Sequence, residues 1–576
     1  MTADEIRRRI IEVVDRNGGH LASSLGAVEI SMALAEVFDP LRDRIVWDVG
    51  HQAYAWKILT DRGGKSFDTL RKTDGVAPFP TPTESAADAA VAGHAGVALS
   101  VAEGLAAARD ARGTGEHVVA VVGDAAIVNG TSLEALNNLA ASTRKVIVVL
   151  NDNKMSISRP VGSLAKLLGR LIASVRYNRV KAAAERTGHR LHLTFLRGAY
   201  HRIESRIKSW FLGNAFFEQF GLRYIGPVDG NDLRAMRAAL IVAKEDKRSV
   251  IIHAVTRKGM GYEPAERNPT AYHGVSAGAL SAEGRAAGGR VGWSEAFGSA
   301  LAELARRDSR IVALTAGMKD GTGLADFAAE FPGRFCDVGI AEGHMVAFAA
   351  GLAAGGMRPV VAVYSTFLQR AVDQVMHDVC IARLPVVFCV DRAGVVGADG
   401  CTHQGVFDIA MLRCLPNIAI AQPCDGEDFR RLLEEALARG GPTILRYPRG
   451  PVPDASVAAG SALAVEVENP DARIQIWATG DRLATARAVA ARTGAGVVFA
   501  RYIKPFDEAL LRRQRAAGKR IVSIENGSAA GGFGEAIGAD MRFGWPDSFV
   551  PHGSVEELER RCGLDVDSIT EALKNG

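Results

Sequence analysis

Short apolar runs that recur between amphipathic stretches constrain the fold of this 576-residue chain more than any other feature. They include residues 118–122, 146–150, 360–363 and 521–524. Continuous apolar runs of this length are typical of strands buried on both faces, as in parallel sheets, and the helical patterns between them supply the crossover connections. We therefore expect an α/β chain of doubly wound, mainly parallel sheets.

Two stretches of low periodicity divide the chain. Residues 276–289 are rich in Ala, Gly and Ser, and residues 451–471 are rich in Pro, Ala and Gly. Such stretches favour linkers, so the sequence predicts three domains, at residues 1–285, 290–452 and 470–576.

The first predicted domain contains a basic segment, residues 159–218, with 12 Lys and Arg against 3 Glu on helical spacing. A membrane-surface or nucleic-acid patch is one interpretation. The interpretation we favour is a solvated helical insertion that covers the site, because the net charge of the whole chain is only +4.

The remaining composition argues against several classes of protein. The small net charge predicts no polyanionic partner, and 48% hydrophobic against 23% charged residues is typical of a globular protein. The N-terminus carries no apolar signal core, and no run of about 18 uncharged apolar residues occurs. We expect a cytoplasmic protein without a nucleic-acid or membrane partner.

Polar side chains follow two neighbouring strands of the first predicted sheet. Asp124 ends the first apolar run, and Asn153 follows the second, 153 − 124 = 29 residues later. Carboxyl ends of parallel strands meet at one edge, where open α/β sheets bind ligands. Because Mg²⁺ prefers a few protein oxygens and completes its shell with phosphate, Asp124, Asn153 and the Met155 carbonyl predict a magnesium diphosphate site. A strand followed by Gly-Asp is also common in α/β proteins without such a site.

Other candidates lie in glycine-bounded loops. In the first predicted domain these are His20, His51, His94, Tyr262 and His273, each of which is also compatible with a structural role. Glu342 lies in a similar loop of the second predicted domain.

The second predicted domain contains three arginines, Arg370, Arg392 and Arg449, each of which follows a predicted strand or begins a loop. Asp399 and His403 occur in the same part of the sequence. Planar guanidinium donors suit a phosphate or carboxylate. The cluster therefore predicts a pocket for an anionic substrate, although a surface salt bridge is the simpler interpretation of any one of them.

From about residue 6 to its C-terminus the chain resembles the 1-deoxy-D-xylulose-5-phosphate synthase family of transketolase-like thiamine-diphosphate enzymes. The resemblance rests on residues 20–26, 47–54, 364–370, 391–400 and 446–450. It implies a magnesium-dependent transferase that joins pyruvate to D-glyceraldehyde 3-phosphate with loss of CO₂, giving 1-deoxy-D-xylulose 5-phosphate for isoprenoid and thiamine biosynthesis. It also implies a homodimer, in which the third domain serves packing and dimerisation.

The resemblance implies a role for each candidate. Glu342 would hydrogen-bond N1′ of the cofactor's aminopyrimidine. The cofactor would be held by His51, His94, Asp124, Ala125, Ala126, Asn153, Tyr262 and Phe367. Substrate binding would fall to Tyr364, Arg370, Arg392, Asp399, His403 and Arg449, and proton handling to His20, His273 and His403. The catalytic residues would be Glu342, these three histidines, Arg370 and Asp399.

The sequence departs from the family pattern at three places, all on the cofactor side. Ala125 replaces the second glycine of Gly-Asp-Gly, Ala95 and Gly96 replace two serines, and Gly343 replaces a glutamine. An added methyl at residue 125 requires a negative φ there. Besides the synthase, two alternatives therefore stand: a paralogue that condenses another donor or acceptor, and a non-catalytic homologue with weakened cofactor binding.

Overall fold

The computed structural model describes residues 1–153, 214–280, 291–454, 457 and 460–575. Met155 and most of the predicted insertion, residues 159–218, lie outside this described part. The chain forms two compact units: Met1–Leu70 with Gly75–Arg285, and Arg71–Asp74 with Ala286–Gly576.

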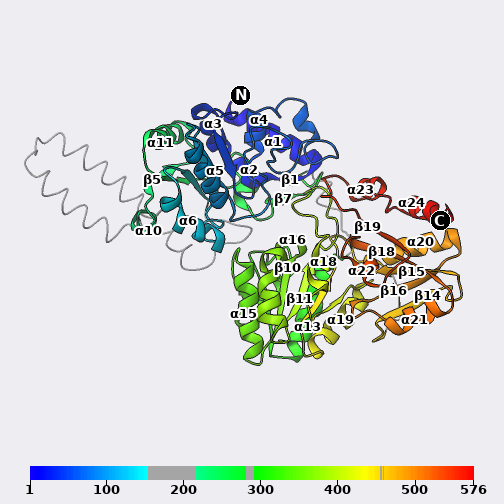
Figure 1. Ribbon diagram of the computed structural model, residues 1–576. Helices are drawn as coiled ribbons and strands as arrows, with labels where there is room; N and C mark the ends of the chain where they lie inside the picture. Colours follow the sequence, from blue (N-terminus) through cyan, green and yellow to red (C-terminus); the bar gives the residue numbers. More distant parts are fainter. Residues whose placement is uncertain (154–213, 281–290, 455–456, 458–459, 576) are drawn as a thin grey trace, which may run out of the picture. The chain divides into compact units, whose positions relative to one another are not determined.

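The first unit is built around a five-stranded, wholly parallel sheet with the order β2-β3-β4-β6-β5 (Figure 1). Its strands are β2 (Arg44–Trp47), β3 (Val118–Gly123), β4 (Ile147–Asp152), β5 (Arg223–Asp229) and β6 (Val250–Val255). Alternate residues of β3 and β4 pack into two different cores. One core includes α5 (Ala98–Arg112) and α6 (Gly130–Ser142), and the other includes α3 (Val28–Val37) and α11 (Leu233–Glu245). Helices therefore cover both faces, as the continuous apolar runs predict.

The remaining elements of this unit surround the sheet. They are α1 (Ala3–Asn17), β1 (Gly19–His20), α2 (Leu21–Gly26), α4 (Tyr54–Leu59), η1 (Ser66–Thr69), α10 (Asn214–Gln219), α12 (Glu263–Arg267) and β7 (Gly274–Val275). β1 and β7 pair antiparallel, with His20 opposite Gly274.

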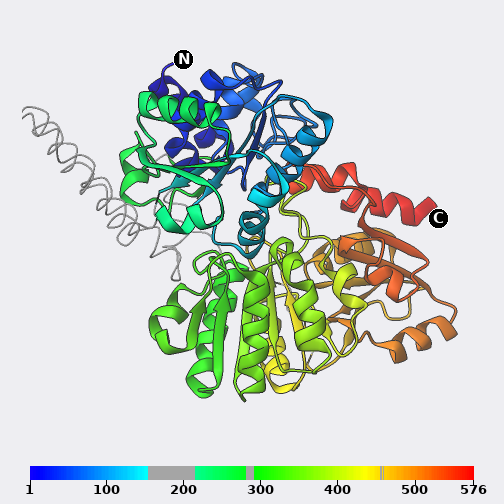
Figure 2. The ribbon, with the colours of Figure 1, turned by 60° about the vertical axis from the view of Figure 1, so that its left-hand side comes forward.

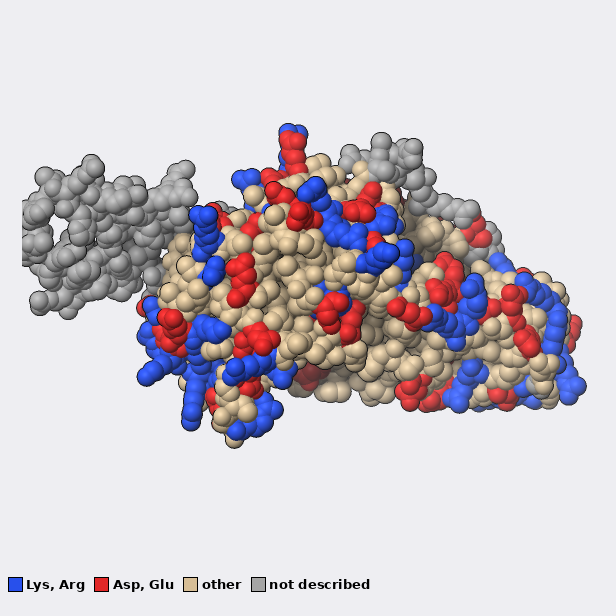
Figure 3. Space-filling model, turned by 90° about the horizontal axis from the view of Figure 1, so that it is seen from above, with Lys and Arg blue, Asp and Glu red and all other residues tan. Residues whose placement is uncertain are grey.

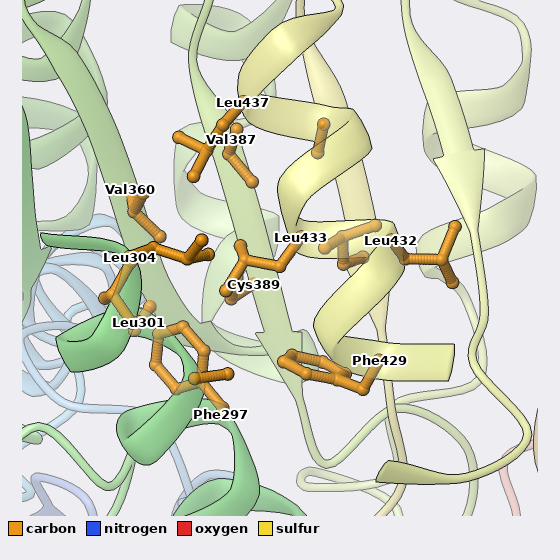
Figure 4. Close-up of a cluster of buried hydrophobic side chains, with 14 of the residues drawn as sticks. Phe297, Leu301, Leu304, Val360, Val387, Cys389, Phe429, Leu432, Leu433 and Leu437 are labelled. Carbon is orange, nitrogen blue, oxygen red and sulfur yellow. The ribbon is translucent and has the colours of Figure 1, made fainter. Parts of the chain in front are cut away.

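The second unit contains a seven-stranded sheet with the order β17-β12-β13-β11-β10-β8-β9. Its strands are β8 (Ile311–Thr315), β9 (Phe335–Asp337), β10 (Arg358–Tyr364), β11 (Val387–Asp391), β12 (Ala419–Ala421), β13 (Thr443–Arg446) and β17 (Tyr502–Lys504). Helices α13 (Trp293–Arg307) and α19 (Gly426–Ala438) bury Phe297, Leu301, Phe429 and Leu433 against the strands (Figure 4). Figure 2 shows the helices of this sheet standing side by side as a layer.

A second, five-stranded sheet completes this unit, with the order β14-β16-β15-β18-β19. Its strands are β14 (Ala464–Glu468), β15 (Ile474–Thr479), β16 (Gly496–Ala500), β18 (Arg520–Ser528) and β19 (Met541–Trp545). The other elements of the unit are α14 (Ala325–Glu330), η3 (Pro332–Arg334), α15 (Glu342–Ala354), α16 (Ser365–Leu368), η4 (Gln369–Ala371), α17 (Val372–Gln374), the π-helical η5 (Val375–Cys380), α18 (Asp408–Arg413), η6 (Gly480–Arg482), α20 (Leu483–Thr493), α21 (Glu508–Ala516), α22 (Phe533–Ala536), α23 (Val555–Arg561) and α24 (Val566–Asn575).

The predicted fold class, mainly parallel α/β sheets, is confirmed. Only the edge strands β14 and β17 run antiparallel in the two larger sheets of the second unit. β14 lies within the stretch that the sequence favours as a linker, and β17 joins the seven-stranded sheet although it follows residue 470. The division into three domains with the predicted bounds stays a prediction.

Charge is spread over the surface. On the face drawn in Figure 3, basic and acidic side chains are interspersed over the described residues, as a net charge of +4 leads one to expect. No helix among the described residues has the length and apolar character needed to cross a membrane.

Candidate active site

In the first unit, the carboxyl ends of β3 and β4 bring the predicted magnesium ligands to one edge of the sheet. Gly123 pairs in register with Asn151, so Asp124 and Asn153 both follow immediately after paired strands. The Asp124 backbone N–H donates to the Asn151 carbonyl at 3.2 Å. This is the arrangement that the sequence predicts, because parallel neighbours end at the same edge.

The Asp124 carboxyl is buried in an electrostatically demanding place. Burial, and secondly the nearby Asp152 carboxylate, raise its pKa to about 8. Burial lowers the pKa of Lys258 to about 8, against the attraction of Asp124. A hard divalent cation would stabilise the ionised form of Asp124, so these oxygen donors fit Mg²⁺.

The turn after β3 accommodates the Ala125 substitution. The φ of Ala125 is not positive, so the backbone at this residue accommodates the methyl group without strain. Ala126 is buried against the core of β3 and α6.

Gly96 shows why its loop excludes a side chain. Its φ is +85°, and an added Cβ would lie 2.5 Å from Oδ1 of Asn129, which caps α6. The Asp48 carboxylate accepts hydrogen bonds from the N–H groups of Gly96 and Ala98 at 2.9 and 3.1 Å, which fixes this loop beside the partly buried His94.

Three of the predicted histidines form one cluster. The ring centroids of His51 and His273 are 5.3 Å apart, and His20 lies 6.2 and 5.7 Å from them. Burial lowers the pKa of both His51 and His273 well below 6.5, with neighbouring cations acting in the same direction. Both rings are therefore neutral near pH 7 and can accept or donate a hydrogen bond. Tyr262 packs edge-on against Tyr272, with ring centroids 5.8 Å apart.

In the second unit, Glu342 is the first residue of α15 and is only 4% exposed. Its Oε2 is buried and has no hydrogen-bond partner among the described residues, and Arg370 Nη1 lies 3.9 Å away. Burial raises the pKa of Glu342, against the opposing effect of Arg370. A buried acceptor without a donor is costly, so this carboxyl fits a ligand that brings an N–H group.

The second unit also contains a cluster of rings around Phe367. Phe367 stacks on Tyr364, with centroids 5.5 Å apart and ring planes at 16°, and meets His403 edge-on at 5.6 Å. Burial raises the pKa of Tyr364 to about 12, so its hydroxyl stays protonated.

Two of the three arginines predicted for an anion pocket, Arg392 and Arg449, line one pocket of this unit, whereas Arg370 does not line it. The Arg392 guanidinium lies 3.8 Å from the Tyr364 ring centroid and donates to the Gly321 carbonyl at 3.0 Å. Arg392 and Arg449 line a pocket of about 460 Å³ together with Gly292, Trp293, Ser294, Gly450 and Pro451. Two guanidinium groups in one open pocket suit a phosphate.

The structure adds residues that the sequence did not single out. Arg71 donates to Asp399 Oδ1 at 2.6 Å, while Arg449 Nη1 lies 4.0 Å from Asp399 Oδ2. Arg71 belongs to the short segment Arg71–Asp74, which is part of the second unit. No local pattern marks Arg71, because its partner is 328 residues away. Lys258 and Asp48 are both buried. Lys258 attracts the Asp124 carboxylate, and Asp48 accepts hydrogen bonds from the Gly96 loop; only the structure shows these contacts.

Comparison with known proteins gives matches over nearly the whole chain. Three sequence profiles match: one described as 1-deoxy-D-xylulose-5-phosphate synthase at residues 1–256, the transketolase pyrimidine-binding domain at 290–454 and the transketolase C-terminal domain at 463–569.

Individual relatives agree with the profiles. The protein named 1-deoxy-D-xylulose-5-phosphate synthase of Oleidesulfovibrio alaskensis is 42% identical, covering 99% of this chain and 94% of its own. The protein of the same name from Nitratidesulfovibrio vulgaris is 44% identical, covering 99% and 93%. Among solved structures, transketolase from Campylobacter jejuni is 18% identical over 100% of this chain and 99% of its own, with a TM-score of 0.46.

Proposed function

Because this chain belongs to the 1-deoxy-D-xylulose-5-phosphate synthase family of thiamine-diphosphate transferases, we propose that it condenses pyruvate with D-glyceraldehyde 3-phosphate. The products would be 1-deoxy-D-xylulose 5-phosphate and CO₂. The observation that carries the proposal is that one chain contains both a buried Glu342, whose Oε2 accepts no hydrogen bond among the described residues, and a pocket lined by two arginines.

Glu342 would act on the cofactor's pyrimidine. Its buried carboxyl, with a raised pKa, can hold a proton shared with N1′ without bulk water competing for it. Phe367 would support the pyrimidine ring by stacking, as its alignment with Tyr364 allows. When bound, thiamine diphosphate supplies the electron sink that decarboxylation of pyruvate requires and that no side chain provides.

The first unit would hold the diphosphate end. Asp124, Asn153 and the Met155 carbonyl would bind Mg²⁺, and the backbone at Ala125 and Ala126 would approach the phosphate oxygens. Support comes from the shared strand edge and from the need of Asp124 for a counter-charge. His51, His94 and Tyr262 would complete the cofactor's surroundings.

The arginine pocket would bind the acceptor. Arg392 and Arg449 would hold its phosphate, and Tyr364, Arg370 and Asp399 would orient the rest of the substrate. A phosphate remote from the reacting carbon supplies binding energy that positions the aldehyde. His20, His273 and His403 would move protons to and from the substrate oxygens, with the neutral imidazole of His273 acting as an acceptor.

We further propose a homodimer that covers one face of α15. The outer side of this helix exposes Ala347, Phe348 and Gly351, and one polar residue, His344, whose ring packs on Phe348. Met376 of the neighbouring η5 and the following Ile381 are exposed too. Several exposed apolar side chains on neighbouring elements are typical of an interface, and a second copy would bring the same surface to a two-fold contact.

The acceptor assignment is tested by Arg449→Ala. We expect kcat/KM for D-glyceraldehyde 3-phosphate to fall about ten- to a hundredfold, because a charge-assisted contact to phosphate contributes about 1.5–3 kcal/mol. The effect on unphosphorylated D-glyceraldehyde should be small. Equal losses for the two aldehydes would contradict a phosphate role for Arg449. Arg439→Ala, which changes an arginine just beyond the C-terminal end of α19, serves as the control.

A further inference from the structure

The turn that carries Arg392 has a backbone conformation that needs support. Arg392 has a φ of +57°, and Gly394, two residues later, has a φ of +86°. A positive φ is rare for a long side chain such as arginine and persists only where the surroundings hold it. The guanidinium that lines the pocket is therefore carried by a strained segment, and the contacts that hold this segment fix the backbone from which the side chain reaches Tyr364 and Gly321.

Asn526, in β18 of the five-stranded sheet, contacts this turn directly. Its Oδ1 accepts hydrogen bonds from the Val395 backbone N–H at 3.3 Å and from the Trp545 indole at 2.9 Å. The amide also fills the space beside Gly394, where an added Cβ would lie 2.2 Å from the Asn526 side chain. Asn526 thus fixes the turn both by a hydrogen bond and by close packing.

Asn526 is itself held in a buried polar network. Its Nδ2 donates to Asp481 Oδ2 at 2.8 Å, and its backbone carbonyl accepts from Arg446 Nη2 at 2.8 Å. Arg446 also binds Asp408, through Nε at 2.9 Å, and Gln422, through Nη1 at 2.7 Å. Asn526, Arg446 and Asp408 are at most 3% exposed. Because most of these bonds are made between buried groups, and only Asp481 is partly exposed, the network leaves the amide little freedom to turn.

We propose that Asn526 is a positioning residue for the acceptor, and that the C-terminal five-stranded sheet thereby sets the orientation of the Arg392 guanidinium. This assigns the sheet a part in substrate recognition beyond the packing and dimerisation expected from the sequence. The inference rests on the proposed function, because it takes Arg392 to be a phosphate ligand.

The test compares the steady-state constants of Asn526→Ala with those of a matched control. We expect KM for D-glyceraldehyde 3-phosphate to rise about tenfold, the effect of losing roughly one buried hydrogen bond at the turn. KM for pyruvate and the calorimetric affinity for thiamine diphosphate should stay within about twofold. Gln514→Ala is the control, because Gln514 is equally buried, accepts from the Trp477 indole at 2.9 Å and belongs to the same C-terminal region. It should leave the acceptor KM unchanged.

A charge-neutral exchange tests the same contact if truncation disturbs folding. Asn526→Asp alone places two carboxylates together at Asp481 and should raise the acceptor KM. Adding Asp481→Asn restores the hydrogen bond between residues 481 and 526, with residue 481 now the donor. A carboxylate oxygen at residue 526 can still accept from the Val395 N–H and the Trp545 indole. The double variant should therefore recover a KM for D-glyceraldehyde 3-phosphate close to that of wild type.

The outcomes separate this inference from the proposed function. If Arg392→Ala raises the acceptor KM but every Asn526 variant behaves like Gln514→Ala, the positioning role is wrong and the phosphate pocket stands. If Arg392→Ala leaves the acceptor KM unchanged, the phosphate assignment fails, and the positioning role fails with it. A uniform loss of kcat in the Asn526 variants without a change in any KM would also overturn the positioning role.

Discussion

At the scale of residues, the sequence could identify those site residues whose flanking segments form a recognisable strand, helix or loop pattern. Asp124 and Asn153 follow buried strands, and Glu342 opens a helix within a glycine-bounded loop. Arg71 and Asn526 could not be identified in this way. Their partners are 328 and 131 residues distant, and no local pattern encodes such contacts.

Gly343, beside Glu342, illustrates the same point for a departure from the family pattern. An added Cβ would lie 3.1 Å from Oε1 of Gln374, which is buried and lacks a hydrogen-bond partner among the described residues. The space beside the first turn of α15 is therefore narrow, and a side chain at residue 343 requires the Gln374 amide to shift by a few tenths of an ångström.

Replacing Gly343 by alanine should accordingly displace Gln374 and disturb the start of α15. Overpacking of this kind costs about 1–3 kcal/mol, and we expect kcat to fall about tenfold. The second change Gln374→Ala should restore most of the rate by removing the contact. Single-turnover kinetics measures this effect, and additive losses in the double variant would show that the two side chains do not compete for the space.

At the scale of elements, the central parallel strands were predictable because continuous apolar runs have few other uses. β14 and β17 were not, because each is an edge strand whose pairing is decided by its neighbours. The π-helical η5 and the placement of Arg71–Asp74 likewise depend on tertiary contacts.

One element of the five-stranded sheet gives the protein a predicted pH dependence of stability. Glu525 of β18 accepts hydrogen bonds from the N–H groups of Phe533 and Gly534 at 2.7 and 2.8 Å, yet burial raises its pKa to about 7. An unfolded glutamate has a pKa of about 4.3. The folded protein therefore binds more protons than the unfolded chain between these values, and stability falls as pH rises across this window.

The variant Glu525→Gln removes this titration. Relative to wild type, its melting temperature should improve steadily from pH 5 to pH 8, even though one accepted hydrogen bond is lost at every pH. Thermal unfolding at several pH values measures this difference. A difference that is independent of pH would contradict the raised pKa of Glu525.

At the scale of the whole molecule, the sequence could predict the fold class but not the limits of its compact units. Both units carry candidate site residues, and the departures at Ala125, Gly96 and Gly343 are each accommodated by local geometry. This favours the working enzyme over the two alternatives left open by the sequence, because the retained residues keep buried, unusual environments that an idle site would not require.

The assembly is tested at the exposed face of α15. Phe348→Glu should shift the protein from dimer toward monomer in sedimentation experiments, because it places a charge in the centre of an apolar contact. Phe549→Glu changes a more exposed phenylalanine in the C-terminal region, 75% against 39% exposed, and should have no such effect. A monomeric wild-type protein at micromolar concentration would rule out the proposed dimer.

The most direct measurement of the central claim is the fate of ¹³C-labelled pyruvate with thiamine diphosphate and Mg²⁺, with and without D-glyceraldehyde 3-phosphate, in wild type and Glu342→Ala. We predict that wild type releases one CO₂ per pentulose phosphate formed and places the two remaining pyruvate carbons in that product. The variant should bind the cofactor but lose turnover at least about a thousandfold. Full activity in the variant, or labelled product other than a pentulose phosphate in wild type, would contradict the account.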